Sequence, residues 1–76
     1  MTNKEFFNKL KEAIETDVTI DENTNLKSLP EYSSLTTLLI IAFIDENFGK
    51  SLSAKELNSV NSVKSLMDLI GDDQFE

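Results

Sequence analysis

The centre of the chain, residues 31–49, reads EYSSLTTLLIIAFIDENFG and is its most apolar segment. Pro30 precedes it and Gly49 closes it, and both residue types commonly flank helices. The adjacent residues Ser33 and Ser34 stand where a helix would begin, and serine is a favoured N-cap residue. We therefore predict a helix that starts at this serine pair and ends at Gly49.

This predicted helix is apolar on two sides. On a helical wheel the first side comprises Thr37, Ile40, Ile41, Ile44 and Phe48, and the opposite side comprises Leu35, Leu39, Ala42 and Glu46. A domain this small buries only about 60% of its unfolded surface, so it cannot bury a helix all round. We expect the first side to face the core and the second to stay at least partly exposed. The exposed leucines are then either ordinary surface residues or a docking face beside Ser34.

The composition provides few groups for catalysis. The chain contains no Cys, no His and no Arg. It therefore lacks thiolate ligands, the usual general base and zinc ligand, and any guanidinium group. We expect no catalytic residues and no metal site, and any thiol chemistry would have to come from a cofactor. An enzyme that used Tyr32 and Ser34 together with an acid is the weakest alternative.

The charge is strongly acidic, with a net value of −7 from 14 acidic residues and 7 lysines. Nucleic-acid binding requires a basic surface, so we expect no nucleic-acid partner. An acidic surface attracts basic partner surfaces, although it also simply promotes solubility. The chain has no apolar run of about 18 residues and no apolar signal segment at its start. We therefore expect a monomer without a membrane span, located in the cytoplasm.

The N-terminal segment is predicted to form an amphipathic helix. Thr2 and Glu5 have the spacing of a capping box, which opens a helix over about residues 3–15. The apolar residues at helical spacing are Phe6, Phe7, Leu10, Ala13 and Ile14. We expect its aromatic pair, Phe6 and Phe7, to lie in the core.

Residues 16–33 break this periodicity and predict a long loop. The isolated aliphatic residues Val18, Ile20, Leu26 and Leu29 are expected to anchor it over the helices. Asp17, Asp21, Asn23 and Asn25 invite comparison with a calcium-binding loop. Counting from Asp21, however, the sixth position is Leu26 rather than Gly and the twelfth is Tyr32 rather than Glu. We therefore expect no dedicated calcium loop.

The C-terminal part predicts two further helices. A capping box at Ser53 and Glu56 opens a short helix to about residue 59. Ser62 caps a last helix, which carries Val63, Leu66, Met67 and Ile70 and ends at Gly71. Residues 72–76 are expected to be a frayed tail. The predicted fold is all-α: a small four-helix bundle with three main helices, one short helix and a long first loop.

This order of elements resembles an acyl carrier protein over nearly the whole chain. The resemblance is carried by Leu26 in the long loop and by the segments YSSLTTLLI (residues 32–40), DENFG (residues 45–49) and NSVKSLMDLI (residues 61–70). In that family a serine followed by leucine, at the start of the second helix, receives phosphopantetheine from coenzyme A. Ser34, followed by Leu35, occupies that place here. The resemblance thus implies a single carrier-protein-like domain over residues 1–76.

The resemblance implies a function as well as a fold. A phosphopantetheinyl transferase would attach the arm to Ser34, and the arm would hold an acyl or aminoacyl group as a thioester, as in fatty acid or polyketide biosynthesis. Partner enzymes that load, process or transfer the group would dock through basic patches. The expected contact residues are Leu35, Leu39, Ala42, Asp45 and Glu46, with Glu31 as a further acidic candidate. Ile44 and Val63 could line a shelter for an acyl chain.

The helix start also has a physical logic of its own. A hydroxyl there is exposed, and the unsatisfied N–H groups and the helix dipole favour an attached phosphodiester anion. The simpler alternative is that Ser33 or Ser34 only caps the helix, although Ser33 can cap while Ser34 carries the arm.

Two positions depart from the family pattern. Ser33 stands where the family usually has the Asp that assists a metal-dependent transferase, and Leu39 stands where the family is often acidic. These departures indicate either a specialised carrier or an unmodified interaction module that uses the Leu35/Leu39 face.

Overall fold

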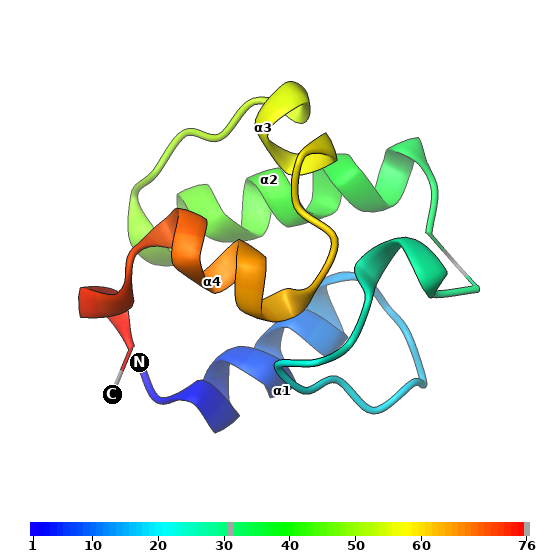
Figure 1. Cartoon of the computed structure of the whole chain (residues 1–76), viewed down its shortest axis with the longest axis horizontal. Coiled ribbons are helices and arrows are strands. Elements are labelled where there is room, and N and C mark those ends of the chain that lie inside the picture. The colour runs from blue at the N-terminus through cyan, green and yellow to red at the C-terminus, as the bar shows by residue number, and fades with distance from the viewer. Residues whose placement is uncertain (31, 76) are drawn as a thin grey trace.

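The computed structural model describes residues 1–30 and 32–75, and its regular structure is helical (Figure 1). The α-helices are α1 (Asn3–Ala13), α2 (Ser34–Phe48), α3 (Ala54–Asn58) and α4 (Val63–Ile70), joined by the 3-10 turns η1 (Leu26–Ser28) and η2 (Asp72–Gln74). The described residues contain no β-strand. The predicted all-α bundle of three main helices and one short helix is therefore confirmed. No helix in this part of the chain is long and apolar enough to cross a membrane.

Local capping signals set the helix starts. In α1 the backbone N–H of Glu5 donates to the hydroxyl of Thr2 over 3.1 Å, and the N–H of Thr2 donates to the Glu5 carboxylate over 3.3 Å. The same pair of hydrogen bonds joins Ser53 and Glu56 at α3, each over 3.1 Å. Both predicted capping boxes are thus formed.

The first helix ends at Ala13, earlier than the predicted residue 15. Glu15 adopts the left-handed backbone conformation, with φ of 54°. The N–H of Thr16 then reaches back to the carbonyl of Lys11, and the N–H of Glu15 reaches back to that of Glu12, each over 3.2 Å. This is the double hydrogen bond of a Schellman cap, which normally has glycine at the left-handed position. The sequence offered no glycine to mark this end.

The second helix begins and ends where the sequence predicted. Ser33 is its N-cap, and Gly49 ends it in the left-handed conformation with φ of 66°, which glycine adopts without steric cost. The predicted inner side is largely buried: Thr37, Ile40 and Ile44 lie in the core, and Ile41 and Phe48 are half-buried. Phe43, which the wheel placed outside that side, is also buried.

The core lies between α1, α2 and α4, the three longer helices in Figure 1. Its largest fully buried side chains are Phe6, Leu10, Ile40, Ile44, Leu66, Ile70 and Val63. The prediction that the aromatic pair of the first helix lies in the core is confirmed for Phe6, whereas Phe7 is half-buried. Of the other apolar residues at helical spacing, Leu10 and Ile14 are buried and Ala13 is half-buried.

The C-terminal segment is attached to the body of the protein through Gln74 and Phe75, so the prediction of a frayed tail is wrong for these two residues. The ring of Phe75 contacts those of Phe6 and Phe48, with centroid separations of 5.0 and 5.5 Å. The amino group of Met1 donates to the carbonyl of Gln74 over 3.3 Å. In Figure 1 the N-terminus accordingly lies close to η2. The tail lies here because aromatic burial outweighs the freedom of a short polar segment.

The long first loop is anchored, as predicted, by Ile20, Leu26 and Leu29, which are all buried. Val18, also predicted as an anchor, is 37% exposed, so that assignment is wrong. The backbone of Val18 is held by a local hydrogen bond instead, in which its N–H donates to the hydroxyl of Thr16.

Backbone hydrogen bonds add a second attachment that the sequence did not reveal. The N–H of Leu26 in the loop donates to the carbonyl of Asn61 over 2.8 Å. The N–H of Val63 donates to the carbonyl of Thr24 in the loop over 2.9 Å. In Figure 1 the loop accordingly passes beside the start of α4.

The acidic and amide residues of this loop serve local turns. The Asp21 carboxylate accepts from the N–H of Asn23 over 2.8 Å, and the Asn25 side chain accepts from the N–H of Lys27 over 3.0 Å. Such bonds are the usual way in which Asp and Asn stabilise a turn. The described residues contain no group of three or more His, Cys, Asp or Glu side chains placed to hold a metal ion.

Candidate functional site

Hydroxyl side chains are concentrated where the chain enters α2. Five of the six residues at positions 32–37 carry one: Tyr32, Ser33, Ser34, Thr36 and Thr37. The hydrogen bonds of these groups decide which oxygen is available for chemistry, because a hydroxyl held by neighbours is less free to react or to bind.

Ser33 and Thr36 form a reciprocal cap. The hydroxyl of Ser33 accepts from the N–H of Thr36 over 3.4 Å, and the N–H of Ser33 donates to the hydroxyl of Thr36 over 3.1 Å. The two oxygens are themselves 3.4 Å apart. This arrangement is a capping box in which threonine takes the place of the usual Glu or Gln. Ser33 is therefore committed to the helix start, as the capping alternative proposed.

Tyr32 and Thr37 form a second pair. Their side-chain oxygens lie 3.1 Å apart. The hydroxyl of Thr37 also lies 3.5 Å from the carbonyl oxygen of Ser33, to which it donates. Thr37 is only 8% exposed, so its polar group needs these partners.

Ser34 is the member of the group that remains open. It is the first residue of α2, and its side chain is exposed. Within residues 1–30 and 32–75, no hydrogen bond to its hydroxyl is formed, whereas the other four hydroxyls are paired. Among the five hydroxyls of residues 32–37, that of Ser34 is thus the one without a hydrogen-bond partner in the described residues.

A shallow cavity of about 240 Å³ opens beside Ser34, between α2 and α3. It is lined by Ser34, Thr37, Leu38, Ala54 and Asn58. Its wall mixes hydroxyl, amide and aliphatic groups. Sequence reasoning did not connect Ala54 and Asn58 with the site, because no local pattern tells which side of α3 faces the start of α2.

The apolar face next to Ser34 is centred on Leu35 and Leu38, which are 64% and 60% exposed. Of the predicted contact residues, Leu35, Ala42, Asp45 and Glu46 are exposed and Leu39 is half-buried. The sequence prediction did not include Leu38 in this exposed face, although it lies one turn from Leu35 on the same side. The core face of α2 is rotated toward Phe43 and Thr36, which turns Leu39 partly inward and Leu38 outward.

The charged residues of α2 lie at its far end. Asp45 and Glu46 follow Ser34 by eleven and twelve positions, which is about 17 Å along a helix. The first turn of α2 contains no acidic side chain. Glu31, the remaining acidic candidate, lies outside the described residues. Ile44 and Val63, considered as a lining for an acyl chain, are both fully buried in the core.

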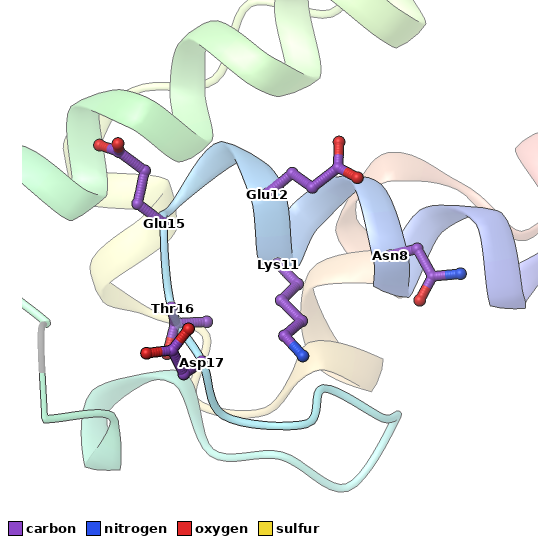
Figure 2. A pocket seen from close by; sticks show the side chains of 6 residues that line it. All are labelled: Asn8, Lys11, Glu12, Glu15, Thr16 and Asp17. Atoms are coloured by element: carbon purple, nitrogen blue, oxygen red, sulfur yellow. The ribbon is translucent and has the colours of Figure 1, made fainter.

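A second, open depression lies along α1, with a volume of about 590 Å³. Its lining residues are Asn8, Lys11, Glu12, Glu15, Thr16 and Asp17. Figure 2 shows that the carboxylates of Glu12 and Glu15 point away from each other. Because they do not converge on a common point, this depression is a weaker candidate than the Ser34 cavity.

Comparisons with known proteins gave no match. No protein-family model matches the chain, and no curated protein or solved structure matches it. A functional proposal therefore has to rest on the chemistry of the Ser34 site.

Proposed function

We propose that this chain is a carrier protein that holds an acyl or aminoacyl group as a thioester on a phosphopantetheine arm attached to Ser34. It delivers this group to partner enzymes and is not itself an enzyme. The main support is that Ser34 is exposed at the first position of a 15-residue helix, while the four neighbouring hydroxyls are hydrogen-bonded.

The attachment step requires an accessible hydroxyl. The Ser34 oxygen would form a bond to the phosphorus of coenzyme A that bears the pantetheine. The phosphoanhydride bond would break, 3′,5′-ADP would leave, and the serine proton would pass to a base on the transferase. The Ser34 hydroxyl is exposed and has no hydrogen-bond partner among the described residues, so no such bond has to break before it reacts.

The start of α2 also fits the product of that step. Helix geometry leaves the N–H groups of the first turn without intrahelical acceptors, and the helix dipole is positive at this end. Both features favour a phosphodiester anion. The first turn of α2 contains no acidic side chain that would repel the negatively charged phosphodiester.

The composition supports a thiol on an attached cofactor rather than a thiol of the chain itself. The chain has no Cys, so a thioester can form only on an added group. It also has no His or Arg, which fits a carrier better than an enzyme. When attached, the arm would supply the sulfur to which the acyl group is bound.

The exposed face suggests how partners would dock. Leu35 and Leu38 would provide apolar contacts beside the arm, with Leu39 and Ala42 continuing the face. The acidic pair at the end of α2 would attract basic patches on a phosphopantetheinyl transferase and on enzymes of acyl loading, processing or transfer. In this proposal the chain acts as a cytoplasmic monomer in fatty acid or polyketide biosynthesis.

An unmodified interaction module is the second candidate. Ser33, rather than Asp, precedes Ser34, and Leu35 and Leu38 expose more than half of their surface. An apolar face of this kind can serve a binding partner without any attached arm. The protein isolated from its own cell decides between the two: a fully modified protein would exclude the module, whereas an unmodified one would support it.

The direct test is the intact mass of the purified chain after incubation with coenzyme A and a broad-specificity phosphopantetheinyl transferase. We expect a gain of one phosphopantetheine in the unaltered chain and in Ser33→Ala, and no gain in Ser34→Ala. The Ser33 variant is the matched control, since it removes the adjacent hydroxyl. No gain in the unaltered chain, or a gain that persists in Ser34→Ala, would overturn the proposal.

A further inference from the structure

We propose that Tyr32 and Thr37 are positioning residues that hold the start of α2 so that Ser34 is presented to the modifying enzyme. This inference rests on the proposed function. Tyr32 lies two residues before Ser34 and Thr37 three residues after it, and their side-chain oxygens are 3.1 Å apart. The contact therefore spans the turn at which the chain enters the helix.

Both ends of this contact are attached to the body of the protein. Thr37 is 8% exposed on the inner side of α2. Tyr32 is half-buried against the core, and its N–H donates over 3.1 Å to the carbonyl of Leu29, itself a buried loop anchor. The hydrogen bond thus joins the anchored end of the loop to the helix.

Ser33 lies between the two partners and has an extended backbone, with φ of −155° and ψ of −179°. Its carbonyl accepts the N–H of Thr37 over 3.1 Å and is also approached by the Thr37 hydroxyl. Thr37 therefore contacts both residues that lead into Ser34. Without the side-chain hydrogen bond, this segment would keep its backbone and capping contacts and the packing of the aromatic ring at position 32, but Ser34 would spend less time in its present orientation.

The two hydroxyls bond each other, and that of Thr37 also bonds the Ser33 carbonyl, so we expect their loss to reduce the fraction of chains that present Ser34. If fewer chains present Ser34, the apparent affinity of the transferase for the chain falls in proportion, whereas the rate of modification at saturating chain concentration is unchanged. Losing one neutral hydrogen bond corresponds to a change of about threefold to tenfold in such an equilibrium. The signature is thus a rise in KM for the chain without a matching fall in kcat.

The test is steady-state modification of Tyr32→Phe, Thr37→Val, Thr37→Ser and the double variant Tyr32→Phe/Thr37→Val by the same transferase. We expect KM for the chain to rise about threefold to tenfold in the Phe and Val variants, with kcat within about twofold of the unaltered value. Thr37→Ser should restore the unaltered KM. The double variant should be no worse than Thr37→Val alone, because Thr37→Val already removes the bond that Tyr32→Phe removes.

Ser65→Ala is the matched control. It removes one partner of the Ser62–Ser65 hydroxyl pair, 2.9 Å apart at the start of α4, and should leave KM unchanged. Tyr32 is the single tyrosine in a chain without tryptophan, so tyrosine emission reports on it directly. This emission should change in Thr37→Val and stay unchanged in Ser65→Ala.

An unaltered KM in both Tyr32→Phe and Thr37→Val would overturn the positioning role while leaving the proposed function intact. An equal rise of KM in Ser65→Ala would also overturn it, because the effect would then reflect general loosening. Failure of the transferase to modify the unaltered chain would instead overturn the proposed function, and the positioning role with it.

Discussion

The ring of Phe75 packs edge-on against that of Phe6, with 5.0 Å between centroids and 78° between ring planes. Phe6 also contacts Phe7, Phe43 and Phe48, so all five phenylalanines of the chain belong to one aromatic group. This group joins the C-terminal residues to α1 and to the second half of α2. Its integrity bears on stability rather than on the Ser34 site, because that site lies at the other end of α2.

Phe75→Ala is therefore expected to destabilise the fold by about 1–3 kcal/mol, since it removes two aromatic contacts and part of the apolar burial. Thermal unfolding followed by circular dichroism would measure the loss. Phe75→Leu should cost less because it keeps most of the apolar volume. A Phe75→Ala variant with unchanged stability would show that the tail contributes nothing to the fold.

Glu15→Gly is expected to stabilise the protein. Glu15 has a left-handed backbone with φ of 54°, which costs a residue with a side chain about 1–2 kcal/mol and costs glycine almost nothing. After allowing for the extra freedom of glycine in the unfolded chain, a gain of about 0.5–1 kcal/mol should remain.

Chemical denaturation of Glu15→Gly beside Glu12→Gly would check this prediction. Glu12 lies within α1, where glycine should lose about 1 kcal/mol. Equal losses in the two variants would contradict the assigned cap at the end of α1.

The folding information that could be predicted from the sequence is mostly local. The starts of α1 and α3 and the end of α2 depend on Thr2, Ser53 and Gly49, each of which acts within about one helical turn. The position of Phe75 could not be predicted in this way, because its partners are far away in the chain. The end of α1 at Ala13 could not be predicted either, since the left-handed residue that follows is Glu15 and glutamate carries no preference for this conformation.

The candidate site, like the fold, could be predicted only where it depends on local sequence. Ser34 follows from its place at the start of an apolar helix, but the availability of its hydroxyl depends on the side-chain pairs around it. Leu38 was missed because both sides of α2 are apolar, so a wheel does not fix which way the helix turns toward the core. That rotation is set by packing, which buries Phe43 and leaves Leu38 60% exposed.

Because Leu38 is exposed, we predict that replacing it changes the binding of a partner without changing the stability of the fold. Leu38→Gln should change the free energy of unfolding by no more than about 0.5 kcal/mol, because surface substitutions have small effects. Leu66→Ala, at a fully buried position, should cost about 2–5 kcal/mol.

If Leu38 contacts the transferase, Leu38→Gln should also raise KM for the chain in the modification assay, as should Leu35→Gln. Normal KM values in both variants would remove this face from the proposed docking surface.

The capping box of α1 predicts a dependence on pH. The backbone N–H and the hydroxyl of Thr2 donate to Glu5 and hold the pKa of its carboxyl group below the ordinary value of 4.5. A carboxylate with a lowered pKa stabilises the fold fully above its unfolded pKa, and this contribution is lost as the pH falls through the folded pKa. The loss of α1 stability should therefore occur below about pH 4.5.

Glu5→Gln should reduce this pH dependence, and Thr2→Ala should bring the pKa of Glu5 back toward its ordinary value. Helix content during acid titration and the NMR titration of the Glu5 carboxyl group would measure the two effects. A Glu5 pKa that is the same with and without Thr2 would contradict the hydrogen-bonded cap.

Substitutions at Ser33 can distinguish its role as the N-cap of α2 from an effect on the modification of Ser34. Asp, Asn and Ser are nearly equal as N-caps, so Ser33→Asp and Ser33→Asn should keep the stability of the unaltered chain, whereas Ser33→Ala should lose about 1 kcal/mol. In the transferase assay, Ser33→Asp should be modified faster, because it restores the carboxylate that the resemblance assigns to a metal-dependent transferase. Ser33→Asn caps equally well without the charge and should be modified at the unaltered rate. Equal rates for the Asp and Asn variants would mean that a carboxylate at position 33 has no part in the reaction.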